Sequence, residues 1–141
     1  SLNAAGDLTG TELADSLGVR QDLALPGFEE NPFAYMARAA VFVLSSAYEG
    51  LPGVLIQAMA SGCPVVSTDC PSGPMEILEH GSYGPLVPVG DDIAMAEAIQ
   101  TVLDSPPSQE RLRVRAAEFS MDRAVEQHLE VLFEVYRKSH V

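Results

Sequence analysis

A carboxylate, several glycines and a helix start occur together in residues 48–62, and this combination is suited to binding an anion. Gly50 and Gly53 allow backbone conformations that other residues avoid, and they let a ligand approach closely. If a helix begins here, the amides of Gly53, Val54 and Leu55 have no partner inside it. Free amides at the positive end of a helix dipole are a common phosphate site. The alternative is an ordinary loop whose glycines serve only the turn.

Two apolar runs, residues 40–44 and 64–68, flank this loop and helix. Neither run alternates with polar residues, which is typical of strands covered on both faces. Two strands joined by a helix-sized link form a parallel pair. The loop then lies at the carboxyl end of the first strand, where open α/β sheets bind their ligands. Gly62 is expected to end the helix.

A second turn-rich loop, residues 69–73, follows the second strand and lies at the same edge of the sheet. Pro74 and Glu76 then begin a short helix that ends at His80 and Gly81. Glu76 suits the positive end of the helix dipole, so it either caps this helix or reaches a ligand. We expect His80 to be a charge partner for the C-terminal end of the helix rather than a catalytic base.

The rest of the chain predicts short strands at residues 3–5, 23–25 and 83–88, the last at a sheet edge because of its prolines. Helices are expected before Gly18, over residues 31–38, after Asp91, after Ser108 and after Ser120. The residues expected to face the core in the first four of these helices are Leu8, Leu13 and Leu17; Phe33 and Tyr35; Ile93, Ala96, Ile99, Val102 and Leu103; and Leu112, Ala116 and Phe119.

The chain has 141 residues, enough for one domain with a hydrophobic core. Its net charge of −12 and pI of about 4.4 argue against a nucleic-acid surface or a patch for anionic membranes. The eight Lys and Arg residues are Arg20, Arg38 and six residues from Arg111 onward. The expected phosphate site therefore has no cation nearby in the sequence.

Two cysteines, Cys63 and Cys70, flank the second expected strand, and their number and spacing give no metal signature. We interpret them as buried, reduced thiols of a cytosolic protein. No apolar run approaches the roughly 18 residues of a membrane span, and no signal peptide is visible. No Ser/His/Asp or Cys/His set supports a hydrolase.

Several stretches of the sequence resemble the family-4 (group 1) retaining glycosyltransferases of GT-B fold. The resemblance is specific from about Gly27 to about Asp91 and weaker toward the C-terminus. The stretches that carry it are Tyr48–Pro52, Gly62–Thr68, Cys70–Gly81 and Tyr83–Asp91.

The sequence departs from the family pattern at two positions. That family marks its nucleotide-sugar site with two glutamates separated by seven residues. Glu49 matches the first glutamate, but Gln57 stands at the second position. Gln57 keeps a carbonyl acceptor and loses the charge, which predicts weaker nucleotide binding. Met75 stands where many relatives carry a basic residue.

The resemblance implies an α/β fold with a Rossmann-like parallel sheet flanked by helices, as in the C-terminal half of a GT-B glycosyltransferase. Residues 1–141 would then form one truncated domain that binds the nucleotide-sugar donor and lacks its first strand and helix. Residues 120–141 would form a C-terminal helix that in the family packs toward the N-terminal domain, which this sequence does not include.

The function implied by the resemblance is transfer of a sugar from a nucleotide-diphosphate sugar to a glycan or lipid acceptor, with retention and without a metal or other cofactor. The acceptor would be bound through the missing N-terminal domain. The setting would be bacterial cell-surface polysaccharide biosynthesis, in the cytoplasm, and the full-length protein could lie peripherally at the inner membrane.

The resemblance also implies roles for individual residues. Without it, Glu49 is only a favourable charge near a helix start, and residues 26–28 are a simple turn with Phe28 in the core. The implied site residues are Glu49 for catalysis and the donor sugar; Gly50, Leu51, Gly53, Val54 and Leu55 for the diphosphate; Gln57 for the ribose; Pro26, Gly27 and Phe28 near the base; and Ser72, Gly73 and Glu76 in a second donor loop.

A second interpretation is a non-catalytic nucleotide-binding or protein-interaction domain derived from the same family. Gln57, Met75 and the missing cation favour it. A sugar-nucleotide epimerase would share the fold but not this loop sequence. On the enzyme interpretation, we expect the isolated chain to be inactive. We also expect it to form a homodimer, because the missing first strand would leave residues 41–44 as an unpaired edge. The two copies would pair this edge or exchange a terminal segment.

Overall fold

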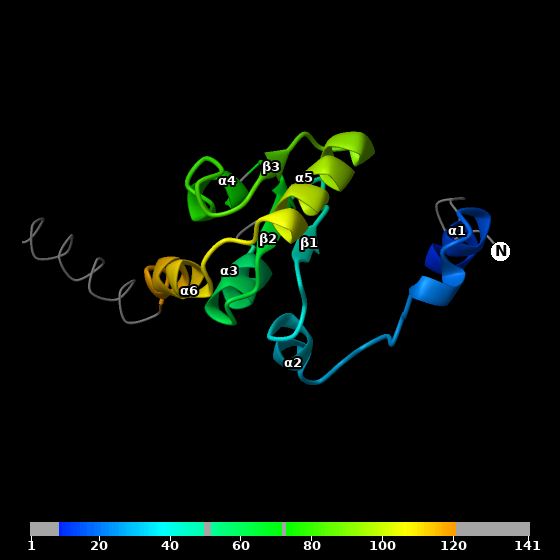
Figure 1. Ribbon diagram of the computed structural model, residues 1–141, viewed down its shortest axis with the longest axis horizontal. Helices are drawn as coiled ribbons and strands as arrows, with labels where there is room; N and C mark the ends of the chain where they lie inside the picture. Colours follow the sequence, from blue (N-terminus) through cyan, green and yellow to red (C-terminus); the bar gives the residue numbers. More distant parts are fainter. Residues whose placement is uncertain (1–8, 50–51, 72, 121–141) are drawn as a thin grey trace, which may run out of the picture. The chain divides into compact units, whose positions relative to one another are not determined.

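The computed structural model describes residues 9–49, 52–71 and 73–120, and it divides the chain into two compact units, residues 1–30 and 31–141 (Figure 1). The expected strand at residues 3–5 and the expected helix after Ser120 lie outside the described residues. Among the described helices, none is both long and apolar enough to cross a bilayer.

The first unit contains α1 (Gly10–Ser16) and a short 3₁₀ helix, η1 (Arg20–Asp22). A reciprocal pair of hydrogen bonds starts α1: the Thr9 side chain accepts from the amide of Glu12, and the Glu12 carboxylate accepts from the amide of Thr9. The predicted apolar face is wrong, because Leu13 and Leu17 are exposed and Ala14 is the buried residue.

The predicted strand at residues 23–25 is also wrong, since these residues are exposed and form no regular structure. An isolated run of three residues gains little from an extended conformation unless a neighbouring strand binds it. Here the carbonyl of Leu23 accepts a hydrogen bond from the Arg20 guanidinium at 3.2 Å instead.

The second unit is built on a parallel sheet of three strands in the order β1 (Phe42–Leu44), β2 (Val65–Thr68) and β3 (Leu86–Val87). The parallel pairing and the edge position of β3 confirm the predictions from the sequence. β2 is buried along its whole length, as expected. β1 is less covered than predicted, with Val43 36% exposed, because it is the other edge of the described sheet.

Helices cover both faces of this sheet. α2 (Pro32–Met36), α3 (Gly53–Ala60), α4 (Pro74–Ile77) and α6 (Gln109–Ala117) share one core with Val65, whereas α5 (Asp92–Asp104) packs on the face of Val66 and Val87. The alternation of Val65 and Val66 between the two cores is the period of a strand. The central helix, α3, buries Leu55, Ala58 and Met59, which recur at helical spacing.

Two predicted core faces differ from the structure. In α2 the buried residue is Met36, whereas Phe33 and Tyr35 are 48% and 56% exposed. In α5, Val102 faces the core as predicted and Ile99 packs partly against it, but the face is completed by Ala94, Met95 and Ala98 rather than by Ile93, Ala96 and Leu103. Small alanines let the helix axis approach the sheet closely, so packing shape overrides side-chain hydrophobicity here. In α6 the prediction is confirmed: Leu112 and Ala116 are buried, and Phe119 packs beside them.

Most predicted helix ends are confirmed. The Asp91 side chain accepts from the amide of Ala94 at 2.9 Å and begins α5, and Ser108 begins α6 in the same way. Asn31 precedes α2 without a capping bond from its side chain. Gly62 follows α3 with a φ of 79°, the left-handed conformation expected of a C-terminal glycine.

Both cysteines are buried and free, on the two sides of β2, as predicted. Burial raises the pKa of the Cys63 thiol. The thiol therefore stays protonated at neutral pH and behaves as a small apolar side chain.

We predict that Gly84→Ala destabilises the second unit by about 1–3 kcal/mol, because a Cβ at Gly84 would lie 2.5 Å from the Val65 carbonyl oxygen in the middle of the sheet. Gly53→Ala is the matched control, since no atom lies within 4 Å of its added Cβ, and it should leave stability unchanged or raise it by up to about 1 kcal/mol. Urea denaturation followed by circular dichroism measures both. Equal midpoints for Gly84→Ala and wild type would contradict the close approach.

We also predict that the chain self-associates through the outer edge of β1. The Phe42 amide donates to the Pro64 carbonyl at 2.7 Å, toward β2. Because the backbone groups of successive strand residues point to opposite sides, those of Val43 point away from β2. No described strand pairs with β1 on that side. Val43→Lys should lower the association, because a charged side chain disfavours edge pairing. Val114→Lys, on the exposed side of α6, is the control and should not lower it. Light scattering at several concentrations decides; a monomeric wild type at high concentration would refute the homodimer.

Candidate anion-binding site

The loops that follow the three strands lie at one edge of the sheet, the carboxyl edge. They are residues 45–52 before α3, residues 69–73 before α4 and residues 88–91 before α5. Because the strands are parallel and adjacent, these loops are neighbours. The first two contain or precede the candidate residues Glu49, Gly53, Val54, Leu55, Gly73 and Glu76.

The remaining candidates are placed differently. Gly50, Leu51 and Ser72 lie outside the described residues. Pro26, Gly27 and Phe28 belong to the first unit. Phe28 is 93% exposed, so the interpretation of this side chain as a core residue is wrong. Gly27 has a φ of 82°, consistent with a turn at this position.

The N-terminal end of α3 has no capping side chain among the described residues. Pro52 stands at the cap position, is buried and supplies no capping side chain. The amide of Leu55 donates to the Pro52 carbonyl at 2.9 Å, so the prediction that this amide is free is wrong. The tight first turn provides the carbonyl that Leu55 uses. Within the described residues, no acceptor is found for the amides of Gly53 and Val54, and the space beside Gly53 is empty for at least 4 Å.

Two hydroxyl groups hold Glu49 at this edge. The Ser46 hydroxyl donates to Oε1 of Glu49 at 2.5 Å, and the buried Thr68 hydroxyl donates to the Ser46 carbonyl at 2.5 Å. Thr68 ends β2, so the end of one strand fixes the loop that follows the neighbouring strand. Neither Ser46 nor Thr68 is predicted as a site residue from the sequence. The available signal is a hydroxyl residue near the end of each run: Ser46 is two positions after the first run, and Thr68 is the last residue of the second.

Gln57 lies on the first turns of α3, four residues after Gly53, and it is exposed. Its backbone carbonyl accepts from the amide and the hydroxyl of Ser61, at 3.1 and 3.0 Å. The structure records no hydrogen bond of its side-chain amide to a described residue. The side chain is therefore available to a ligand that lies along this helix.

The second loop reaches α4 through Gly73, whose φ of 113° belongs to the region that favours glycine. The carbonyl of Gly73 accepts from the amide of Ile77 at 2.9 Å, and Pro74 is buried at the first helical position. The Glu76 side chain is exposed. No side-chain hydrogen bond caps the start of α4 within the described residues. The two roles expected for Glu76, a cap or a ligand contact, therefore stay predictions.

The C-terminal ends of α3 and α4 are occupied by arginines of α6. Arg113 donates to the Ser61 carbonyl at 3.4 Å, beside Gly62. Arg115 donates to the carbonyls of Ile77 at 3.0 Å and Glu76 at 2.6 Å. The prediction that His80 is the charge partner of the α4 carbonyls is therefore wrong. The arginine reaches these carbonyls from another helix, which local sequence cannot indicate.

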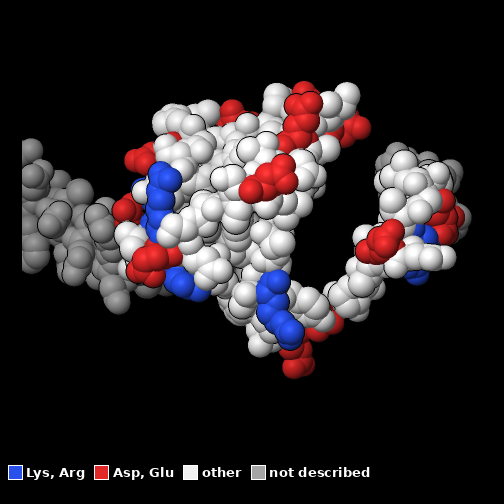
Figure 2. Space-filling view, in the orientation of Figure 1, with Lys and Arg blue, Asp and Glu red and all other residues white. Residues whose placement is uncertain are grey.

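The electrostatics of the second unit follow from this arrangement. Figure 2 shows basic side chains over α6 and near α2, and acidic side chains over α5. No Lys or Arg occurs from residue 40 to residue 110. Arg113 and Arg115 of α6 bind the C-terminal ends of α3 and α4, not their N-terminal ends. An anion at the start of α3 would thus meet the helix dipole and the amides of Gly53 and Val54, for which the described residues supply neither an acceptor nor a cation.

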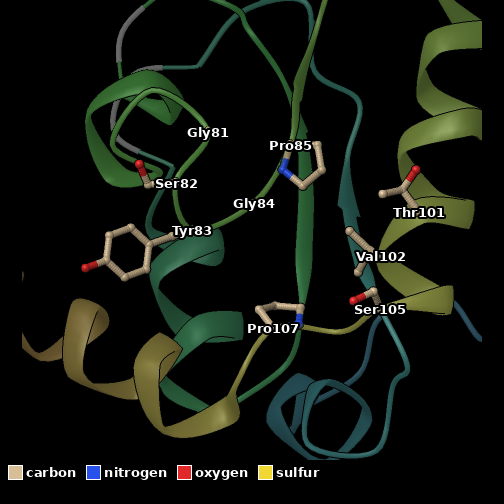
Figure 3. Close-up of a pocket in the computed structure, with 9 residues that line it drawn as sticks. All are labelled: Gly81, Ser82, Tyr83, Gly84, Pro85, Thr101, Val102, Ser105 and Pro107. Atoms are coloured by element: carbon tan, nitrogen blue, oxygen red, sulfur yellow. The ribbon is translucent and has the colours of Figure 1, made fainter.

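A cavity of about 190 Å³ lies elsewhere, at the amino end of β3 and the C-terminal end of α5 (Figure 3). Its lining has hydroxyls but no charged side chain, and Figure 3 shows the Tyr83 side chain directed away from Pro85 and Thr101. The cavity is at the edge of the sheet opposite the candidate site, so the two are separate. The lining residues are Gly81, Ser82, Tyr83, Gly84, Pro85, Thr101, Val102, Ser105 and Pro107.

Comparison with known proteins gives a family match over residues 2–105, to the family described as Glycosyl transferases group 1. The chain is 36% identical over 92 residues to a Campylobacter jejuni enzyme, N-acetylgalactosamine-N,N'-diacetylbacillosaminyl-diphospho-undecaprenol 4-alpha-N-acetylgalactosaminyltransferase. This alignment covers 65% of the chain and 25% of that enzyme.

Two solved structures have a similar fold. The lipopolysaccharide outer core galactosyltransferase WaaB, in its apo form, matches with a TM-score of 0.79 and 22% identity, over 88% of this chain and 36% of that one. Anabaena Alr3699/HepE, in complex with UDP, matches with a TM-score of 0.71 and 23% identity, over 88% of this chain and 35% of that one. The expected α/β fold is confirmed, and the chain spans little more than a third of either structure.

Proposed function

Because this chain belongs to the group 1 glycosyl transferases, we propose that it is the donor-binding domain of an enzyme that transfers a sugar, with retention, from a nucleotide-diphosphate sugar to a glycan or lipid acceptor. The chemistry would need no metal, since the backbone would carry the charge of the leaving group. In the described residues, no cluster of three or more His, Cys, Asp or Glu side chains could hold a metal ion.

The observation that carries the proposal is the start of α3 at the carboxyl edge, four residues after Glu49, where no described side chain caps the helix. The amides of Gly53 and Val54 would bind the donor diphosphate, with help from the helix dipole. Negative charge builds on the diphosphate as the sugar leaves, and fixed donors aimed at that charge lower the barrier. By contrast, the start of α5 is closed by its own Asp91.

Glu49 is the proposed contact with the hydroxyls of the donor sugar. A carboxylate can accept several hydrogen bonds, and a charged acceptor forms stronger bonds than a neutral one. The bond from Ser46 to Oε1 fixes the carboxylate before the donor arrives. An acceptor that is already held in place loses less conformational freedom on binding, which favours affinity and correct orientation of the donor sugar.

The nucleoside would lie along α3. Gln57 is the proposed ribose contact, since its exposed amide offers one acceptor and two donors. Leu51 and Gly50 would add to the diphosphate site, and Leu55 would contribute packing rather than its amide. The segment of Pro26, Gly27 and Phe28 is the proposed base contact, where an exposed aromatic ring could stack on the base.

The proposed setting is the biosynthesis of a cell-surface glycan on the cytoplasmic side of a membrane. Two observations support it: the similarity to an undecaprenol-linked glycan transferase and the fold shared with a lipopolysaccharide galactosyltransferase. The UDP named for the Anabaena structure makes a uridine nucleotide the first donor to test. The acceptor would be bound by a further domain.

A second candidate function is a nucleotide-binding or interaction domain without catalysis. Gln57 and the absence of basic side chains from residue 40 to residue 110 favour it. Both features weaken anion binding, since a neutral amide replaces a carboxylate and no described cation faces the diphosphate. Binding without turnover in the longer natural protein would select this alternative.

We predict that the chain binds UDP weakly, with a Kd of about 1 mM, which corresponds to roughly −4 kcal/mol. Gln57→Glu should lower the Kd by about fivefold if this side chain faces the ribose, since a charged acceptor binds hydroxyls more strongly. Gln100→Glu makes the same change of charge on an exposed position of α5 and should leave the Kd unchanged. Titration calorimetry measures all three proteins, and equal affinities would remove Gln57 from the site.

We further predict that the chain alone transfers no sugar, whereas a longer natural protein that contains it does. Closure of a cleft between two domains would bring the acceptor to the donor. The assay uses UDP-, GDP- and ADP-sugars, and turnover by the isolated chain would refute the two-domain mechanism. In the longer protein, Glu49→Gln should lower kcat/KM by roughly 10- to 100-fold, because a charge-assisted contact is lost. The exposed Glu97 of α5 supplies the control, Glu97→Gln, which should leave kcat/KM unchanged.

A further inference from the structure

The position of α4 depends on contacts made at its C-terminal end. The helix has four residues, Pro74–Ile77, which is too few to be stable by itself. It is followed by Glu79 and His80, both in the left-handed conformation with φ values of 47° and 53°. Such a conformation is unfavourable for a residue other than glycine. The surroundings must therefore hold this turn.

Backbone hydrogen bonds hold the turn from within, such as that from the amide of His80 to the Met75 carbonyl at 2.9 Å, and from outside it is bound by Arg115 of α6. Its Nε donates to the Ile77 carbonyl at 3.0 Å, and its Nη2 donates to the Glu76 carbonyl at 2.6 Å. Within the described residues, no other donor to the Ile77 carbonyl is found, whereas the Glu76 carbonyl also accepts from the amide of Glu79 at 3.2 Å. A cation at this end also interacts favourably with the helix dipole.

The guanidinium of Arg115 is itself fixed on its other sides. Its Nη1 forms a salt bridge with Glu118, one turn further along α6. Its carbon Cζ lies 5.3 Å from the centre of the Tyr83 ring and 4.9 Å from that of Phe119. A planar group held by a carboxylate and two rings, and donating to two carbonyls, cannot be replaced by the point charge of a lysine.

We propose that Arg115 is a positioning residue for ligand binding at the carboxyl edge. At 1.5 Å per residue, α4 is only about 6 Å long, so a shift of its C-terminal end moves Gly73 at the other end almost equally. Through α4, Arg115 sets where Gly73 and the following turn meet the bound nucleotide sugar. This inference rests on the proposed function, since it assigns that loop to the same ligand.

Arg111 offers a matched control on the same helix. Its carbon Cζ lies 4.7 Å from the centre of the Tyr83 ring, so it shares this ring with Arg115. The structure shows Arg115, and not Arg111, donating to the α4 carbonyls. Arg111→Lys and Arg115→Lys therefore make the same chemical change beside the same ring. Only Arg115→Lys removes the pair of guanidinium donors that binds the α4 carbonyls.

The experiment has two parts, both at a temperature where wild type and the two variants are fully folded by circular dichroism. In the absence of ligand, NMR records the amide resonances of Gly73 and Met75, and UDP is then titrated against each protein. We expect Arg115→Lys to move both resonances and to raise the Kd for UDP by about fivefold, the factor that a loss near 1 kcal/mol produces. We expect Arg111→Lys to do neither. If Arg115→Lys is unfolded, Arg115→Gln, which keeps two planar donors, replaces it with the same expectations.

The outcomes separate the two claims. Resonances that move without any binding of UDP to wild type would overturn the proposed function and leave the anchoring of α4 supported. Binding of UDP to wild type with an unchanged Kd in Arg115→Lys would overturn the positioning role and leave the proposed function intact. An equal loss of affinity in Arg111→Lys would also overturn it, because the effect would then belong to the Tyr83 ring or to general charge.

Discussion

The parallel direction of the three strands is the constraint on which the rest of the second unit depends. A parallel strand cannot be reached by a short turn, so each connection must return along a face of the sheet. Here α3 and α4 return on the face of Val65, and α5 follows β3 on the other face. Every helix that follows a strand then starts at the carboxyl edge. The candidate site is a consequence of this direction before any side chain is considered.

What distinguishes the three helix starts at this edge is the residue before each one. Pro52 and Gly73 have no acceptor in their side chains, so they do not cap the starts of α3 and α4, whereas the Asp91 side chain accepts from the first turn of α5. A capping carboxylate stabilises a helix, typically by about 1 kcal/mol, and it also excludes an anion from the same amides. α3 and α4 forgo that stabilisation at the edge where a ligand is expected, and their opposite ends are bound by α6.

The parts of the fold that depend on local chemistry could be predicted from the sequence. The parallel strands, the glycine that ends α3 and the cap at Asp91 are examples, because each follows from a few adjacent residues. The strand predicted at residues 23–25 failed because pairing requires a partner that the segment does not contain. Arg115 was missed because the carbonyls that it binds are 38 and 39 positions away in the sequence.

The distribution of charge limits how an anion could bind to the second unit. The whole chain has a net charge of −12 and no Lys or Arg from residue 40 to residue 110, so its overall field does not attract an anion to the second unit. The described arginines that bind helices stabilise the C-terminal ends of α3 and α4 instead. An anion at the carboxyl edge would then be bound by backbone amides. These act at short range and must point at the anion more exactly than a charged side chain must. A site of this kind depends on exact placement of its helices. Arg113 and Arg115 bind the C-terminal ends of α3 and α4, so they help to set where the N-terminal ends of these helices lie at the carboxyl edge.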